Sequence, residues 1–89
     1  MKSTLKILFA DDDFKYSLVL KRFLEREGYE VTYTGNGTMA LKQFPVVKPD
    51  LVLLDINMPG LNGFEVAEKI REQDRHCLLY TSDAADEAR

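Results

Sequence analysis

The sequence predicts an α/β fold, a doubly wound parallel sheet, because segments typical of strands and of helices alternate along it. Two runs, residues 6–10 and 51–54, are almost wholly apolar instead of alternating with polar residues. Such runs are expected of strands buried on both faces of a parallel sheet. An aspartate follows each run at once. Right-handed crossovers would give the strand order 2-1-3, and a short fourth strand is possible.

The segment after the first strand predicts a helix that begins at Asp13, a favoured N-cap residue, and ends near Gly28. Residues 30–34 then alternate polar and apolar side chains, which is typical of a half-exposed strand at one edge of the sheet. The apolar residues of the helix recur at helical spacing, and the stripe that they predict to be buried is Tyr16, Val19, Leu20, Phe23 and Leu24.

A short second helix is predicted after the turn signal at residues 36–37, and Pro45 with Pro49 predicts its end before the third strand. A third helix is predicted to begin at Asn62, which forms a capping box with Glu65 three residues later. The inward-facing residues of these two helices are predicted to be Ala40, Leu41, Phe44, Val66, Ala67 and Ile70.

Composition and charge exclude several classes of protein. At 89 residues, 45% hydrophobic and 30% charged, the chain has the make-up of one soluble domain. A formal net charge of -3 gives no basic surface for nucleic acid through this segment. No apolar stretch approaches the roughly 20 residues of a membrane span. We see no secretory signal, so we expect a cytoplasmic protein that does not enter a membrane.

Three acidic residues, Asp11, Asp12 and Asp55, stand where the first and third predicted strands end. Because ligands of open α/β sheets bind beyond the carboxyl ends of the strands, neighbouring strands would gather these carboxylates in one crevice. Such a cluster repels itself unless a cation joins it, and clustered carboxylates suit Mg²⁺. The single cysteine, Cys77, cannot form an internal disulfide, and the single histidine, His76, cannot anchor a metal site alone.

A competing interpretation is that an acidic residue after a strand is only a helix cap or a solvated turn. We prefer this interpretation for Asp13. For Asp12 and Asp55, the joint placement at two neighbouring strand ends favours a functional site instead.

The same residues carry a resemblance to a known family. Residues 6–13 (KILFADDD), residues 49–55 and above all residues 55–65 (DINMPGLNGFE) resemble the receiver domain of two-component response regulators, which has a flavodoxin-like fold. The match spans Lys6 to about Glu72. The acidic pair, the strand-terminal aspartate and the Met-Pro-Gly-x-x-Gly loop at matching spacing are together specific for that family.

The resemblance implies a role for each matching position. Asp55 resembles the aspartate that takes a phosphoryl group from the phosphohistidine of a sensor histidine kinase or a phosphotransfer protein. Asp12 resembles the direct Mg²⁺ ligand, and Asp11 resembles its acidic neighbour, which often acts through water. Asn57 would supply its backbone carbonyl, so the implied metal set is Asp11, Asp12, Asp55 and Asn57. Such a domain is not an enzyme and catalyses at most its own phosphorylation and dephosphorylation.

The loop after Asp55 contains residues suited to a tight turn. Pro59 and Gly60 would shape the loop beside the phosphate, and Gly63 would allow a close backbone approach before the third helix.

Receivers also have a fourth strand ending in Thr or Ser, which hydrogen-bonds the phosphate, and a fifth ending in Lys. Residues 78–82 resemble the fourth strand, with Thr81 as the hydroxyl, although Thr81 follows Ile70 more closely than in the family. The sequence has no counterpart of the fifth strand, its lysine or the last helices. We therefore expect the chain to bind metal without signalling.

The run from Cys77 to Glu87 matches, residue for residue, a translation of a transposon-based sequencing adapter. On this hypothesis, residues 1–76 are a truncated receiver domain and residues 77–89 are an adapter-derived tail, to be excluded from fold reasoning. In the alternative, the segment is native and Thr81 belongs to a shortened loop. Codons that differ from those of the adapter would refute the first hypothesis.

Two other functions stay open. A phosphohydrolase of the haloacid-dehalogenase type also begins with a strand-terminal aspartate, but such enzymes resemble Asp-x-Asp, whereas this chain has Asp55-Ile56-Asn57. A pseudo-receiver would act as an interaction module that never takes phosphate. Turnover of phosphate esters would favour the first alternative, and a lack of Mg²⁺-dependent beryllofluoride binding would favour the second.

Overall fold

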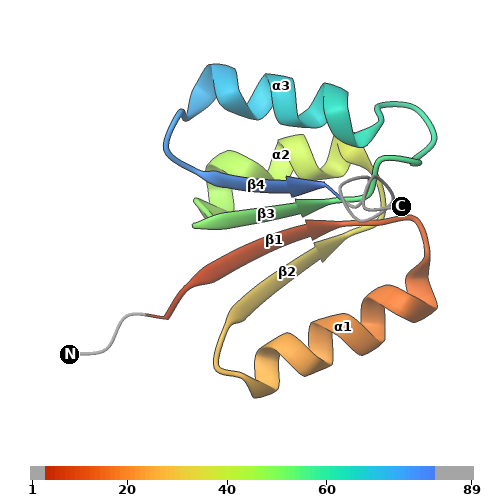
Figure 1. Cartoon of the computed structure of the whole chain (residues 1–89), viewed down its shortest axis with the longest axis vertical. Helices are drawn as coiled ribbons and strands as arrows, with labels where there is room; N and C mark the ends of the chain where they lie inside the picture. The colour runs from red at the N-terminus through yellow and green to blue at the C-terminus, as the bar shows by residue number, and fades with distance from the viewer. Residues whose placement is uncertain (1–3, 82–89) are drawn as a thin grey trace, which may run out of the picture.

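The computed structural model describes residues 4–81. Four strands form one sheet in the order β2-β1-β3-β4, and every neighbouring pair is parallel (Figure 1). The predicted doubly wound α/β fold and its 2-1-3 order are confirmed, and the fourth strand is present beside the third. Along the chain the elements are β1 (Lys6–Ala10), α1 (Phe14–Arg26), β2 (Glu30–Thr34), α2 (Gly37–Val47), β3 (Leu51–Leu54), α3 (Gly63–Gln73) and β4 (Leu78–Thr81).

The segment interpreted as an adapter-derived tail begins at Cys77, one residue before β4. Cys77 is buried, and β4 pairs with β3 from Leu78 to Thr81. Residues 82–89 lie outside the described residues. The division into a truncated receiver at residues 1–76 and a tail at residues 77–89 therefore stays a prediction. Within residues 4–81 the last element is β4, and none of the helices is long and apolar enough to cross a membrane.

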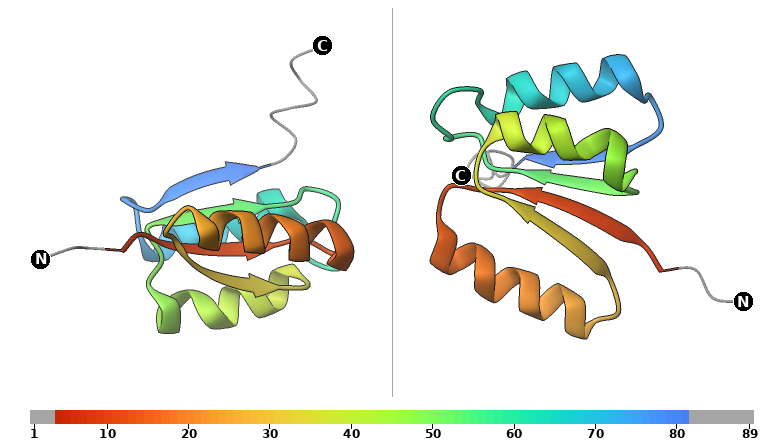
Figure 2. Two further views of the ribbon diagram at one scale, coloured as in Figure 1. Left: turned by 90° about the horizontal axis from the view of Figure 1, so that it is seen from below. Right: turned by 180° about the vertical axis from the view of Figure 1, so that it is seen from behind.

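Helices lie on both faces of the sheet. α1 covers one face, while α2 and α3 lie side by side on the other (Figures 1 and 2). β1 is buried from both sides: Leu8 and Ala10 belong to the cluster under α2 and α3, whereas Ile7 and Phe9 belong to the cluster under α1. Burial on both faces is the physical reason for the uninterrupted apolar run that predicted this strand.

The buried stripe predicted for α1 is wrong in part. Leu20 and Leu24 pack against the core, but Tyr16, Val19 and Phe23 are 58%, 69% and 56% exposed. In the described part of the chain, α1 is the single helix on its face of the sheet, so no second helix covers its flanks (Figure 2). Helical periodicity predicted which side faces inward but overestimated the width of the covered side.

The helices on the opposite face follow the prediction more closely. Four of their predicted inward residues are buried, and the other two pack against the same cluster. Asn62 and Glu65 form both hydrogen bonds of the predicted capping box. The predicted end of α2 is wrong only for Pro45, which lies inside the helix; α2 ends before Pro49 and β3, at Lys48, which has a left-handed φ of 53°. Pro45 sits in the last turn, where its missing N–H removes only one helical hydrogen bond.

Candidate functional site

The carboxyl ends of β1 and β3 lie side by side, because their last residues, Ala10 and Leu54, are partners in the sheet. The Asp55 N–H donates to the Ala10 carbonyl at 2.9 Å, and the Asp11 N–H donates to the Thr34 carbonyl at 3.2 Å. Hydrogen bonding of the sheet type thus continues one residue beyond each strand. It fixes the backbone at the two points where the acidic side chains begin.

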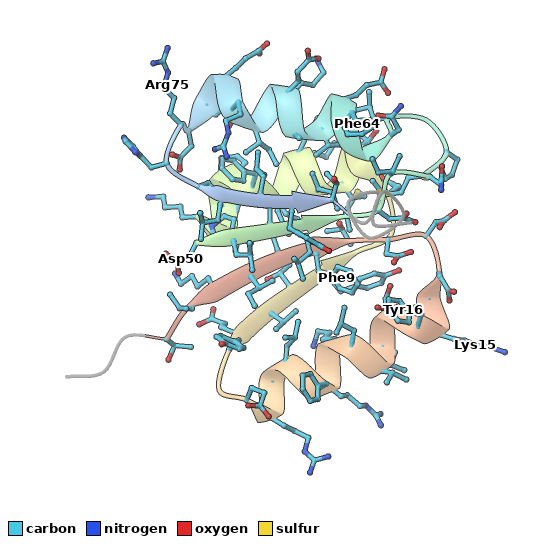
Figure 3. All side chains as sticks on the ribbon, viewed as in Figure 1. Phe9, Lys15, Tyr16, Asp50, Phe64 and Arg75 are labelled. Carbon is cyan, nitrogen blue, oxygen red and sulfur yellow. The ribbon has the colours of Figure 1, made fainter. Side chains whose placement is uncertain are left out.

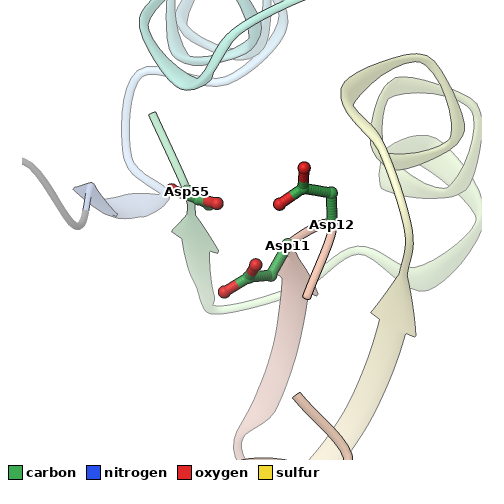
Figure 4. A group of neighbouring side chains, drawn as sticks. All are labelled: Asp11, Asp12 and Asp55. Carbon is green, nitrogen blue, oxygen red and sulfur yellow. The ribbon is translucent and has the colours of Figure 1, made fainter. Parts of the chain in front are cut away.

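Three carboxylates meet at this edge of the sheet (Figure 4). One oxygen from each of Asp11, Asp12 and Asp55 lies within 4.8 Å of the other two. Asp11 is buried, Asp12 is exposed and Asp55 is half-buried. The predicted gathering of these side chains at neighbouring strand ends is confirmed. Clustered carboxylate oxygens with this spacing fit a hard divalent cation such as Mg²⁺.

Burial raises the pKa of the Asp11 carboxyl above its ordinary value of 3.8, because the charged form loses water. The Asp13 N–H, which donates to Asp11 Oδ1 at 2.9 Å, lowers the pKa in part, and the negative charge of Asp55 raises it further. Ionisation of Asp11 beside the negative charge of Asp55 is therefore less favourable than ionisation of an aspartate in water. A bound cation would relieve this repulsion.

The loop after β3 orients the Asp55 carboxylate. The Asn57 N–H donates to Asp55 Oδ1 at 3.1 Å, and the Gly63 N–H donates to the Ile56 carbonyl at 3.3 Å. A Cβ atom at Gly63 would lie 2.8 Å from the Asp55 carbonyl oxygen, so a larger residue would push α3 away. The predicted close approach at Gly63 is confirmed. Gly60 has a φ of 77°, which a glycine adopts without strain in this turn.

Two further predicted site residues lie at the same edge. Asn57 is exposed and follows Asp55 by two residues, and the role of its carbonyl stays a prediction. Thr81 is the last residue of β4 and pairs with Leu54, which directly precedes Asp55. The register therefore brings Thr81 to the acidic end of the sheet, and its contact with a phosphate stays a prediction.

A cavity of about 100 Å³ opens on the α1 side of the acidic residues. Figure 3 shows Phe9 and Tyr16 at the end of the sheet where α1 begins. The lining of the cavity is largely apolar and includes Asp11, which agrees with the burial of that carboxyl. Its lining residues are Phe9, Asp11, Tyr16, Leu20, Leu53, Leu54, Asp55 and Tyr80.

Two residues near the site were not predicted from the sequence. The Tyr33 hydroxyl donates to the Asp11 carbonyl at 2.6 Å. A Cβ atom at Gly37 would lie 2.6 Å from Val66 Cγ2, so this glycine allows α2 and α3 to approach closely. The available signal for Tyr33 was an aromatic residue with a polar tip near the carboxyl end of an edge strand. For Gly37 there was only a turn signal, which carries no information on α3.

Two relatives of the chain come from Bacillus subtilis (strain 168). The chain is 39% identical over 82 residues to the alkaline phosphatase synthesis transcriptional regulatory protein PhoP, covering 92% of this chain and 34% of PhoP. It is 35% identical over 82 residues to sporulation initiation phosphotransferase F, covering 92% of this chain and 66% of that protein. The chain thus spans about a third of PhoP and about two thirds of the phosphotransferase.

A solved structure with the same fold is that of response regulator protein TrrA from Thermotoga maritima, in complex with Mg²⁺-BeF. The identity is 44% and the TM-score is 0.77, over 81% of this chain and 63% of the TrrA chain.

The sequence pattern of the response regulator receiver domain matches residues 7–89. This range holds the acidic pair after β1, the aspartate after β3 and the glycine loop that follows, which are the residues that first indicated the resemblance. With the strand order, the gathered carboxylates and the relatives in agreement, the chain belongs to the receiver domain family of two-component response regulators.

Proposed function

We propose that this receiver domain is a phosphoacceptor, in which Asp55 takes a phosphoryl group from the phosphohistidine of a sensor histidine kinase or a phosphotransfer protein. Asp11, Asp12, Asp55 and the backbone carbonyl of Asn57 would hold Mg²⁺. The observation that carries the proposal is the meeting of three carboxylates within 4.8 Å at two neighbouring strand ends. A relative named a phosphotransferase and a related structure in complex with Mg²⁺-BeF support it.

Asp55 is suited to the role of nucleophile. It is half-buried, so a donor can reach it, and the Asn57 N–H orients its carboxylate through Oδ1. A carboxylate oxygen of Asp55 would form a bond to phosphorus while the phosphorus–nitrogen bond of the donor breaks and its electron pair returns to the imidazole. Two negative groups meet in this step. Bound Mg²⁺ supplies the charge neutralisation that lets them approach.

Asp11 and Asp12 would divide the binding of the metal ion between them. Asp12 is exposed at the mouth of the cluster, which suits a direct ligand. Asp11 is buried, and its carboxylate already accepts the Asp13 N–H, which suits an acidic neighbour that acts through a water molecule. This arrangement agrees with Mg²⁺ chemistry, since the ion keeps several waters and uses few carboxylates.

Thr81 is proposed as the hydroxyl that contacts the phosphate. Its pairing with Leu54 places it one strand away from the residue that precedes Asp55. The proposed location of the protein is the cytoplasm, where its donor kinase domain would act. Of the two alternatives, the relatives give no support to a phosphohydrolase, and binding of beryllofluoride separates the pseudo-receiver from a phosphoacceptor.

The test is binding of beryllofluoride, followed by fluorine NMR, with and without Mg²⁺. Beryllofluoride has the shape and charge of a phosphoryl group, so we expect the wild-type chain to bind it only when Mg²⁺ is present. Asp55→Asn should abolish this binding, because the amide lacks the negative oxygen that joins beryllium. Phosphorylation by acetyl phosphate, measured by intact mass, should be lost in the same variant.

Asp13→Asn is the matched control. Asp13 lies next to the acidic cluster, but its carboxylate caps α1 by accepting the Tyr16 N–H at 3.0 Å, and asparagine caps equally well. This variant should bind beryllofluoride like the wild type. Phosphate uptake by Asp55→Asn would refute the assignment of Asp55, and a wild-type chain that never binds beryllofluoride would favour the pseudo-receiver.

A further inference from the structure

We propose that Tyr33 is a positioning residue for the acidic pair, which holds the peptide unit between Asp11 and Asp12 in the orientation required for metal binding. The inference rests on the proposed function, because the metal site is part of that function. Tyr33 belongs to β2, a strand that contributes no carboxylate to the cluster. Its role would therefore be indirect, through the backbone of the residues that bind.

Both backbone polar groups of Asp11 are bonded to the end of β2. Its N–H donates to the Thr34 carbonyl at 3.2 Å, and its carbonyl accepts the Tyr33 hydroxyl at 2.6 Å. The first bond continues the sheet, whereas the second comes from a side chain and lies beyond the last strand partners, Ala10 and Thr34. The Tyr33 hydroxyl thus fixes a carbonyl that the sheet itself does not reach.

Aromatic contacts hold the Tyr33 ring in place, one from before and one from after residues 11–13. Its centroid lies 5.7 Å from that of Phe9, near the end of β1, and 6.3 Å from that of Phe14, the first residue of α1. Both pairs are tilted at 55°, an arrangement that aromatic rings favour. Tyr33 therefore bridges the strand before the acidic pair and the helix after it.

The carbonyl of Asp11 and the N–H of Asp12 belong to one planar peptide unit. Fixing that carbonyl therefore sets the direction of the backbone between the two acidic residues. The Asp11 carboxylate is held separately by the Asp13 N–H at 2.9 Å, so the peptide unit chiefly governs where the exposed Asp12 points. Without the hydroxyl, the unit would rotate more freely, and binding the metal ion would require it to be ordered first.

The test compares Mg²⁺ binding by the full chain and by Tyr33→Phe, using calorimetric titration. The phenylalanine keeps the ring contacts and removes only the hydroxyl. Thr34→Val is the matched control, because it also removes a hydroxyl bonded to a carbonyl, from Thr34 Oγ1 to Phe9 at 3.3 Å, one residue along the same strand. The NMR resonance of the Asp12 amide in metal-free protein gives a second readout.

We expect Tyr33→Phe to weaken Mg²⁺ binding by roughly tenfold. This is the lower end of the losses in metal affinity that follow when a group that orients metal ligands is removed. The Asp12 amide resonance should shift, and Thr34→Val should leave the affinity unchanged. Unchanged affinity in a folded Tyr33→Phe variant would overturn the positioning role alone, as would equal weakening by the two variants. If the wild-type chain binds no Mg²⁺, both the proposed function and this inference are refuted.

Discussion

The two faces of the sheet differ in how completely helices cover them. Under α2 and α3, ten buried residues form one cluster, whereas under α1 the corresponding cluster holds three. α2 and α3 support each other side by side, and their predicted inward residues are covered. α1 has no neighbouring helix in residues 4–81, and three of the five residues of its predicted apolar stripe are exposed. An apolar stripe thus predicts which side of a helix faces the core. How many residues of the stripe are buried depends on what packs beside the helix.

The acidic site lies where these two faces meet. Gly63, at the start of α3, brings that helix against the backbone of Asp55. On the opposite face, Asp11 lines a cavity together with Phe9 and Tyr16. Tight packing under α3 therefore fixes the position of Asp55, the proposed nucleophile. Asp11, whose pKa is raised, lies toward the face that α1 covers only in part.

The largest expected difference between the faces is in core packing. Ile70→Ala, on α3, should lower the free energy of unfolding by about 2–5 kcal/mol, because Ile70 is fully buried and its loss leaves a cavity. This is a large part of the roughly 5–15 kcal/mol that stabilises a typical domain. Urea denaturation followed by far-UV circular dichroism measures the change.

Val19→Ala, on α1, is the matched control. Val19 is 69% exposed and apolar, so its truncation should change the free energy of unfolding by at most about 0.5 kcal/mol. Equal losses in Ile70→Ala and Val19→Ala would contradict the difference between the faces, and would show that the exposed side of α1 is covered in solution.

A smaller effect on the free energy of unfolding is expected where α3 contacts the loop that follows Asp55. Gly63→Ala would place a Cβ atom 2.8 Å from the Asp55 carbonyl oxygen, so α3 or the loop must move, at about 1–3 kcal/mol. The nearest atom to a Cβ at Gly35 would be the Tyr33 hydroxyl at 3.9 Å, an ordinary contact. Gly35→Ala should therefore be tolerated, and Gly63→Ala alone should also weaken Mg²⁺ binding in a calorimetric titration.

Much of this arrangement could be predicted from the sequence, because its signals are local. The apolar run of β1, the capping box at Asn62 and the aspartates at the strand ends each depend on residues close together in the chain. Tyr33 could not be assigned, since its hydroxyl bonds a residue 22 positions away. Gly37 was missed for the same reason, because the side chain that it accommodates belongs to Val66. Contacts between segments that are distant in the sequence can be assigned only when the fold is known.

The smallest expected effect is a pH dependence that arises on the α1 side of the site. The pKa of Asp11 is raised above 3.8 in the folded chain, chiefly by burial. Between the unfolded and the folded pKa, the folded chain binds more protons than the unfolded chain, so stability falls as pH rises through this window. Below this pH window, Asp11 is protonated in both the folded and the unfolded chain. Above the window, Asp11 is ionised in both, and the folded chain bears the full cost of burying its charge.

Asp11→Asn should remove this contribution, so that the metal-free variant is more stable than the wild type at neutral pH and similar to it at low pH. Asp13→Asn keeps its capping bond to Tyr16 and should retain the wild-type pH dependence. Mg²⁺ should reverse the order at neutral pH, because only the folded wild-type chain brings all three carboxylates together. Thermal unfolding across pH, with and without Mg²⁺, measures both effects. A wild-type chain that gains stability as pH rises through this window, while Asp11→Asn does not, would show that the folded protein stabilises the charged form of Asp11.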